Sequence, residues 1–207
     1  MSKITFINTM RILILFILTI IIFRQNIYSE EAQNFQFEKV SHLDNLPNNE
    51  ILSLYQDSDG FIWLATTGGL YQFDGYDLTE YRSNVYNFNL LTHNRITCLK
   101  EDEQKNLYIG TNEGLNILNK KTGHIIKSKH PQFSRNYIAS ITQTAEGEIW
   151  VGTNNGLYNY CLEKDSCHKI LDKTIKGMLV DSKQNIWVGT WSEGLFRYHP
   201  KDKKWIE

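Results

Sequence analysis

A short apolar and aromatic stretch is repeated four times in this chain of 207 residues, and this repetition limits the possible folds more than any other feature. The copies begin at Ile62, Leu107, Ile149 and Ile186, at intervals of 45, 42 and 37 residues. Each copy has Trp or Tyr second and Thr fifth, and a Gly-Leu pair follows soon after. Repeats of this length form propeller blades when each holds several short strands, and helical solenoids when apolar residues recur every three or four positions. The chain shows no helical periodicity, so the repeat predicts an all-β propeller.

Each repeat is expected to form four short antiparallel strands, which make one propeller blade. The first strands are expected at residues 51–54, 96–99, 138–141 and 175–178. The second strands carry the Trp or Tyr and the Thr, the third begin at the Gly-Leu pairs, and the fourth are the most variable. The blades are placed near residues 48–82, 93–128, 135–171 and 172–207, within a propeller region of residues 30–207.

The turns between the first and second strands share one design. An Asp or Thr opens each turn, where its side-chain oxygen can accept backbone N–H groups, and a Gly or Asn closes it, where a positive φ is expected. The opening residues are Asp57, Asp102, Thr144 and Asp181, and the closing residues are Gly60, Asn106, Gly147 and Asn185. The first turn resembles the start of a calcium loop, but Phe61 and Gly68 stand where that loop needs an Asx and a Glu. We therefore expect a turn and no metal.

The side chains of the repeat indicate blades that are stacked face to face. The second strand is apolar on both faces, whereas a sheet with one solvated face would alternate apolar and polar residues. The first strand has a small residue at its third position in every repeat, as crowding near a propeller axis requires. These small residues are Ser53, Cys98, Ser140 and Gly177.

The chain has three cysteines, with no spacing typical of a zinc site. Cys98 is explained as a small buried residue of a first strand. Cys161 follows a third strand and Cys167 precedes a fourth, with five residues between them. In an oxidising compartment these two thiols could form a disulfide across the hairpin, and two free thiols are the alternative.

Residues 1–29 differ from the rest of the chain. Lys3 and Arg11 precede an apolar run from Ile12 to Phe23, and Ser29 follows as a small residue at a plausible cleavage point. This layout is typical of a secretory signal peptide. An uncleaved N-terminal membrane anchor is the alternative, although twelve helical residues span only ~18 Å. The net charge of −1 gives no basic surface that would indicate nucleic-acid binding.

The two ends of the repeat array indicate that it is incomplete. Residues 35–40 have the position of a fourth strand before the first blade, and residues 204–207 form another candidate fourth strand. In a closed four-bladed ring both segments would compete for the same outermost strand position of the last blade. Closed propellers have about 4–8 blades. We therefore expect part of a larger, about seven-bladed propeller, with Glu207 as a truncation.

Two segments, residues 46–70 and 185–195, resemble the two-component regulator propeller repeat. The resemblance covers residues 35–207 and implies the N-terminal, periplasmic sensor part of a hybrid two-component histidine kinase. In that family the propellers precede a membrane helix and a kinase, and several sense oligosaccharides. The second repeat departs in detail, because Tyr108 replaces Trp and Gln104-Lys105 replaces Asp-Gly. None of the six histidines has the surroundings of a phosphoacceptor, so a downstream kinase is expected outside this chain.

The resemblance favours a binding module that senses an oligosaccharide, without a cofactor. Candidate ligand-binding residues lie in loops before first strands and in one longer turn, and an ordinary exposed loop is the alternative for each. They are His93, Asn94, Arg95, Arg135, Asn136, Tyr137 and Trp191. Expected partners are further blades or the kinase module of a longer chain, and the resemblance leaves homodimers of a full-length protein open. A secreted scaffold for proteins and a propeller lyase or glycosidase are the alternative functions.

Overall fold

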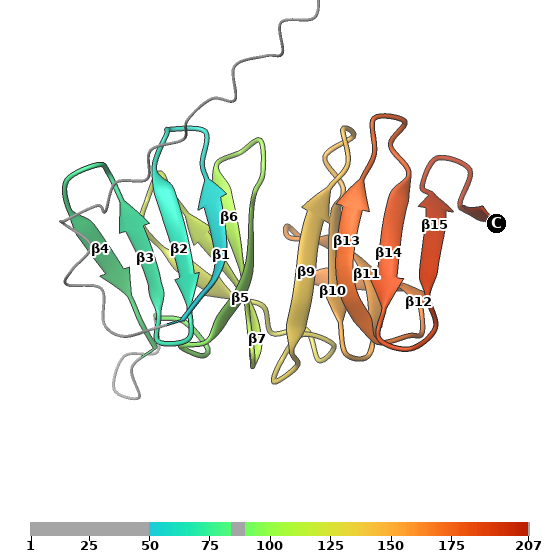
Figure 1. Cartoon of the computed structure of the whole chain (residues 1–207), viewed down its shortest axis with the longest axis horizontal. Coiled ribbons are helices and arrows are strands. Elements are labelled where there is room, and N and C mark those ends of the chain that lie inside the picture. The colour runs from blue at the N-terminus through green and yellow to red at the C-terminus, as the bar shows by residue number, and fades with distance from the viewer. Residues whose placement is uncertain (1–49, 84–89, 207) are drawn as a thin grey trace, which may run out of the picture. The chain divides into compact units, whose positions relative to one another are not determined.

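The computed structural model describes residues 50–83 and 90–206, which form sixteen strands in four antiparallel sheets (Figure 1). The chain divides into two compact units, residues 1–40 and 41–207, and every described residue belongs to the second unit. The expected signal segment (1–29) and the expected strand at 35–40 lie outside the described residues. No helix in the described part of the chain has the length and apolar character needed to cross a membrane.

The strands of each sheet are hydrogen-bonded in chain order, and we call each sheet a blade. Blade 1 contains β1 (Ile51–Gln56), β2 (Ile62–Thr66), β3 (Leu70–Phe73) and β4 (Leu78–Tyr81). Blade 2 contains β5 (Ile96–Glu101), β6 (Asn106–Thr111), β7 (Gly114–Asn119) and β8 (Ile125–Lys127). Blade 3 contains β9 (Ile138–Gln143), β10 (Ile149–Thr153), β11 (Gly156–Cys161) and β12 (Ser166–Leu171). Blade 4 contains β13 (Ile175–Val180), β14 (Ile186–Thr190), β15 (Leu195–His199) and β16 (Lys204–Ile206). The predicted all-β fold of four-stranded antiparallel blades is confirmed.

Consecutive blades pack through their first strands, because β5 contacts both β1 and β9, and β9 contacts β13. Each apolar cluster combines the face of one blade that carries the second-strand Trp or Tyr with the opposite face of the next blade. Between blades 3 and 4, for example, Trp150 and Leu157 pack with Ile175, Ile186 and Val188. Full burial of one such side chain stabilises the fold by ~1.5–3 kcal/mol. This sharing explains why the second strands are apolar on both faces.

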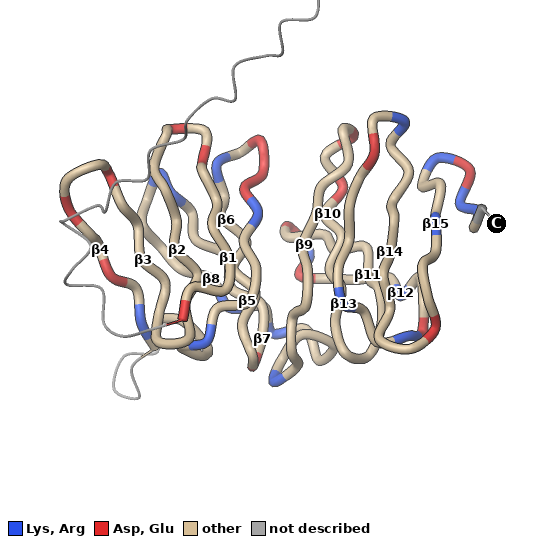
Figure 2. The backbone as a smooth tube through the Cα atoms, in the orientation of Figure 1, with Lys and Arg blue, Asp and Glu red and all other residues tan. Residues whose placement is uncertain are grey.

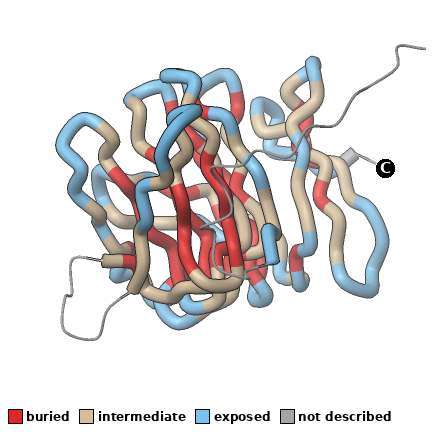
Figure 3. The backbone as a smooth tube through the Cα atoms, turned by 60° about the vertical axis from the view of Figure 1, so that its left-hand side comes forward, coloured by how far each residue is buried: buried red, intermediate tan, exposed pale blue. Residues whose placement is uncertain are grey.

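Burial and charge are separated along the strands. Buried residues run through the middle of the sheets, and the turns at both ends are mostly exposed (Figure 3). Lys, Arg, Asp and Glu residues gather in the turns, with both signs interspersed (Figure 2). The centres of the sheets therefore form the packed core, and the polar groups that could contact a ligand lie at the ends and edges of the blades.

The small residues of the first two strands make room for the next blade. A Cβ atom added to Gly152 would lie 2.5 Å from Cγ2 of Ile175, which belongs to the first strand of blade 4. A Cβ on Gly110 would lie 2.5 Å from Sγ of Cys98 and 2.9 Å from Cγ2 of Ile138 in blade 3. Cys98 therefore has the packing role that its position in the repeat indicates.

The turn between first and second strands differs from the prediction in one respect. Positive φ angles occur at Gly60 (93°) and Gly147 (84°), as expected, but in the other two turns they occur at Lys105 (67°) and Gln184 (64°). The expectation that Asn106 and Asn185 carry this conformation is wrong. Their side-chain amides instead donate hydrogen bonds of 2.9 Å to the Asp that opens the same turn. The Asn residues thus hold the carboxylate of the turn and are not required for its backbone.

The candidate disulfide is absent, because Cys161 and Cys167 are both free thiols. The register pairs Tyr160 with Cys167 and Cys161 with Ser166. Adjacent residues of a strand point to opposite faces, so the two cysteines lie on opposite faces of blade 3. Cys167 packs against the apolar cluster between blades 2 and 3, whereas Cys161 is exposed. A disulfide would therefore require a shift of register.

Candidate functional site

The residues proposed from the sequence lie at one end of their blades, which we call the loop end. There, the residue before the first strand accepts a hydrogen bond from the turn between the second and third strands. The carbonyl of Arg95 accepts from the N–H of Asn112 at 3.1 Å, and that of Thr174 accepts from the N–H of Trp191 at 2.9 Å. The loops before β5 and β13 and the turn after β14 are thereby fixed at this end.

In blade 2, two of the three candidate side chains stabilise their own loop. Nδ1 of His93 accepts the backbone N–H of Arg95 at 2.9 Å, and Oδ1 of Asn94 accepts the N–H of Ser83 at 2.7 Å. The guanidinium of Arg95 makes no hydrogen bond or ion pair with any described residue. Arg95 is thus the side chain of this group that remains available to a ligand.

In blade 3, the candidate residues follow a tight turn before β9. Asn136 donates to the carbonyl of Gln132 at 2.8 Å and accepts from Nδ2 of Asn155 at 3.2 Å, so its amide is used by the fold. Arg135 is exposed and has a positive φ of 61°, and Tyr137 is half-buried. Neither Arg135 nor Tyr137 has a side-chain partner among residues 50–83 and 90–206.

In blade 4, the Trp191 side chain is 69% exposed. Nζ of Lys176 lies 3.6 Å from the centroid of one Trp191 ring, which is a close cation–π contact. The hydroxyl of Thr174 donates to the carbonyl of Asn154 at 2.9 Å and so connects blades 3 and 4 at this end. No described contact gathers the candidates of blades 2, 3 and 4 into a single pocket.

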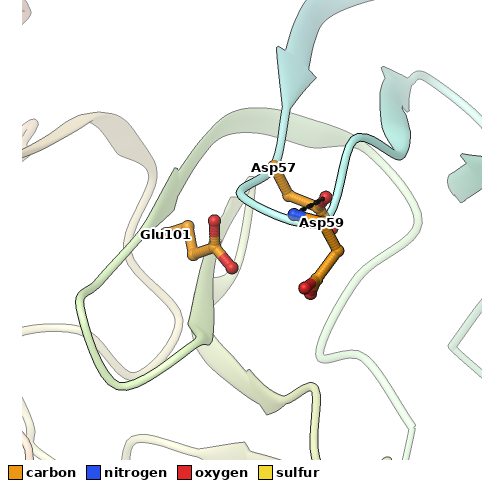
Figure 4. A group of neighbouring side chains, drawn as sticks. All are labelled: Asp57, Asp59 and Glu101. Atoms are coloured by element: carbon orange, nitrogen blue, oxygen red, sulfur yellow. Dashed lines mark hydrogen bonds between the residues drawn. The ribbon is translucent and has the colours of Figure 1, made fainter.

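A group of carboxylates between blades 1 and 2 has the composition of a cation site (Figure 4). Asp57 and Asp59 belong to the turn after β1, and Glu101 ends β5. Nζ of Lys120 lies 2.6 Å from Asp57, 2.8 Å from Asp59 and 2.6 Å from Glu101. The lysine ammonium therefore has the position that a metal ion would take, and the group works as a link between the two blades.

The ionisation of this group follows from its contacts. Burial alone would raise the pKa of Asp57, but hydrogen bonds from Lys120 and the indole of Trp63 outweigh it and lower the pKa. Hydrogen bonds from Lys105 and Lys120 lower the pKa of the more exposed Asp59 to about 2. The pKa of Lys120 is raised, because the three carboxylates outweigh its own burial. Asp57, Asp59 and Lys120 thus remain charged near neutral pH.

A cavity of about 400 Å³ lies between the outer parts of blades 3 and 4, and we call it the rim cavity. Its aromatic walls are Trp150 and Tyr198, with ring centroids 5.5 Å apart, and Trp205, whose ring lies 4.9 Å from that of Tyr198. Polar side chains on its wall include Glu148, Asn159, His168, Lys169 and Lys203. None of the seven candidate ligand-binding residues lines it. Sequence reasoning missed this cavity, although Thr144 in place of the Asp of the other turns marked blade 3 as different.

The repeats match a known family model. The model described as "Two component regulator propeller" matches residues 45–68, 90–113 and 132–155, which contain the first two strands of blades 1 to 3. The fourth repeat has the same sequence pattern but is not among the matched segments.

Two solved structures and one curated protein are similar to this chain. The extracellular domain of a putative hybrid two component system from B. thetaiotaomicron is 26% identical with a TM-score of 0.62, over 72% of this chain and 21% of that one. A second such domain from B. thetaiotaomicron is 20% identical with a TM-score of 0.65, over 86% of this chain and 25% of that one. "Histidine kinase P4" from Formosa agariphila is 33% identical over 70 residues, which are 33% of this chain and 5% of that protein.

The chain spans a quarter or less of the length of each of these proteins. The two solved structures are extracellular parts of signalling proteins and share the propeller architecture seen here. The repeated strand pattern, the four-stranded blades and the matched segments all agree. The first three repeats are therefore two component regulator propeller repeats.

Proposed function

We propose that this chain is part of a periplasmic propeller that binds an oligosaccharide and regulates a downstream histidine kinase. The observation that carries this proposal is the likeness of the repeats to extracellular domains of hybrid two component systems. Ligand binding would change how the propeller is held, and this change would be passed to the kinase. The apolar run near the N-terminus, with its basic start, supports export.

The loop end offers groups suited to a sugar. Arg95 and Arg135 present planar guanidinium groups that can donate paired hydrogen bonds to hydroxyl oxygens. Tyr137 and Trp191 present aromatic surface on which the C–H face of a sugar ring can pack. Their side chains, apart from the Lys176 contact of Trp191, have no described partner within the fold.

The outer face of blade 4 supports a propeller that continues beyond four blades. The Leu that begins the third strand is fully buried in the first three blades, at Leu70, Leu115 and Leu157, because the next blade covers it. The equivalent Leu195 is 65% exposed, and Leu179 on the same blade is 64% exposed. A further blade of the same repeat would bury Leu195 as the next blade buries Leu70, Leu115 and Leu157.

A protein-binding scaffold is the second candidate, and the same exposed leucines favour it. Apolar side chains that gather on one exposed face commonly mark contact with another protein. The two candidates differ in what binds: the sensor requires an oligosaccharide at the loop end, whereas the scaffold requires a polypeptide on blade 4.

The test uses the whole polypeptide that the gene encodes, reconstituted in membrane vesicles, with autophosphorylation followed over a panel of oligosaccharides. We expect at least one oligosaccharide to change the rate, and Arg135→Ala or Tyr137→Ala to weaken the response. Lys121→Ala, an exposed change in the turn between β7 and β8, is the matched control and should leave it intact. A rate that no oligosaccharide changes would contradict the sensor role.

A further inference from the structure

Blade 3 lacks a hydrogen bond that stabilises the turns of blades 1 and 4. The indole N–H of Trp63 donates to Asp57 at 2.8 Å, and that of Trp187 donates to Asp181 at 2.9 Å. In blade 3 the position of the Asp is taken by Thr144. Nε1 of Trp150 and Oγ1 of Thr144 are both buried, and neither has a partner among the described residues. An unpaired buried donor is costly and rare, so this N–H requires an explanation.

A second replacement in the same turn adds a carboxylate. Asn106 and Asn185 donate their amides to the turn Asp in blades 2 and 4. The equivalent residue of blade 3 is Glu148, which lines the rim cavity together with Trp150. The two replacements remove the acceptor of the indole N–H and place a different acceptor on the cavity wall.

The rim cavity combines aromatic surface with both donors and acceptors. Its volume of about 400 Å³ falls within the range of small-molecule sites, about 300–1,000 Å³. Trp150, Tyr198 and Trp205 form a continuous group of rings. The amide of Asn159 makes no hydrogen bond with any described residue and lies opposite His168 in the register of β11 and β12.

The charges on the wall favour a neutral ligand. Glu148 and Lys203 carry opposite charges, and Lys169 is paired with Asp172. An aromatic wall accommodates the C–H face of a saturated ring, while an indole N–H, an amide and a carboxylate match its hydroxyl groups. A ligand with one apolar face and several hydroxyls satisfies all of these groups together.

We propose that the rim cavity binds a neutral polyhydroxylated ring, such as one pyranose unit, and that a shift of the buried Trp150 side chain on binding brings its unpaired N–H to a ligand oxygen. This inference rests on the proposed ligand-sensing function and adds a second place of contact, away from the loop end. Blade 3 thereby exchanges a hydrogen bond within its turn for one to the ligand.

The experiment follows the indole N–H signals of the five tryptophans of the ¹⁵N-labelled chain by NMR during titration with methyl β-glucopyranoside and methyl β-galactopyranoside. We expect a saturable shift of the Trp150 signal with at least one of the two probes, and little change at Trp63, whose N–H is bonded to Asp57. A Trp150 signal that neither probe moves would overturn the inference.

Two variants and a control make the test specific. Thr144→Asp supplies the acceptor present in blades 1 and 4 and should abolish the Trp150 shift while the blade stays folded. Asn159→Ala should weaken binding about tenfold through lost hydrogen bonds, whereas the exposed change Lys164→Ala should have no effect. Equal shifts in native chain and Thr144→Asp would also overturn the inference.

The outcomes separate this inference from the proposed function. If the probes shift Trp191 but not Trp150, the rim site is wrong and a sensor with a loop-end site remains. If Trp150 shifts and Asn159→Ala weakens that shift, while no oligosaccharide alters autophosphorylation, the rim site stands and the kinase-coupled function is wrong.

Discussion

Nζ of Lys120 lies 2.6 Å from Oδ2 of Asp57, and this ion pair joins the turn after β7 to the turn after β1. The side chain of Lys120 is 8% exposed and that of Asp57 is fully buried. Glu101 and Asp59 share the same ammonium. One lysine therefore bridges acidic groups from two blades, in addition to the apolar cluster that packs blade 1 on blade 2.

Lys120→Met should strongly destabilise the chain, because it leaves buried carboxylates without a counter-charge. The expected loss is ~3–5 kcal/mol of unfolding free energy, measured by urea denaturation. Lys169→Met is the matched control, because Lys169 pairs with Asp172 at the surface and should cost at most ~1 kcal/mol. Similar small losses in both variants would show that the Lys120 cluster does not hold the blades together.

The same cluster should make stability fall in acid. The pKa values of Asp57 and Asp59 are lower in the folded chain than their ordinary value of 3.8. Carboxylates of this kind contribute stability above the unfolded pKa and lose it as the pH falls through the folded pKa, about 2 for Asp59. Urea denaturation at a series of pH values should therefore show a decline from about pH 4 to pH 2.

Lys120→Met provides the control for this pH dependence. Without the ammonium, Asp57 loses its hydrogen bond and attraction from Lys120, so its pKa should rise and the loss of stability in acid should be smaller in the variant. Parallel pH profiles for the native chain and Lys120→Met would contradict the assignment of the acid effect to this cluster.

Blade 3 should become more stable when its turn is restored to the design of the other repeats. Thr144→Asp gives the indole of Trp150 and the turn an acceptor, but it also brings a carboxylate close to Glu148. Thr144→Asp combined with Glu148→Asn should therefore raise the unfolding free energy by ~1–2 kcal/mol, and by more than the sum of the single changes. A double-mutant cycle by urea denaturation measures this coupling, and an additive cycle would exclude it.

The three thiols should react at different rates, as their faces and burial indicate. Cys161 is exposed, whereas burial raises the pKa of Cys98 to about 12 and also raises that of Cys167. Dithionitrobenzoate should label one thiol quickly in the native chain, and Cys161→Ser should remove this fast phase. After denaturation without a reductant all three thiols should react, and a count of one would reveal a disulfide between Cys161 and Cys167.

The fold could be predicted from the sequence because the same strand pattern occurs in four repeats. A strand that is weakly indicated in one repeat is supported by the equivalent strands of the others. The disulfide hypothesis failed on register, since proximity in a hairpin says nothing about the face on which each thiol lies. Lys120 lies in a variable turn, 63 residues from Asp57, and nothing local indicates their contact. The rim cavity is lined by Trp150 of blade 3 and Trp205 of blade 4, and only the packing of the two blades brings them to the same space. The positive φ at Lys105 was missed because residue preference pointed to the neighbouring Asn.

Gly152 and Gly189 have the same place in the repeat but different surroundings. In Gly152→Ala the new methyl group would overlap Ile175 of blade 4, at 2.5 Å, and overpacking of this kind costs ~1–3 kcal/mol. In Gly189→Ala the nearest atom is the carbonyl oxygen of Gly177 at 3.7 Å, so this change should be neutral or stabilise by up to ~1 kcal/mol. Thermal and urea unfolding of the two variants measure the difference, and equal effects would contradict the packing seen here. If a further blade covers Gly189, the same Gly189→Ala change should become destabilising in the longer polypeptide, because a first-strand Ile would then lie over it as Ile175 lies over Gly152.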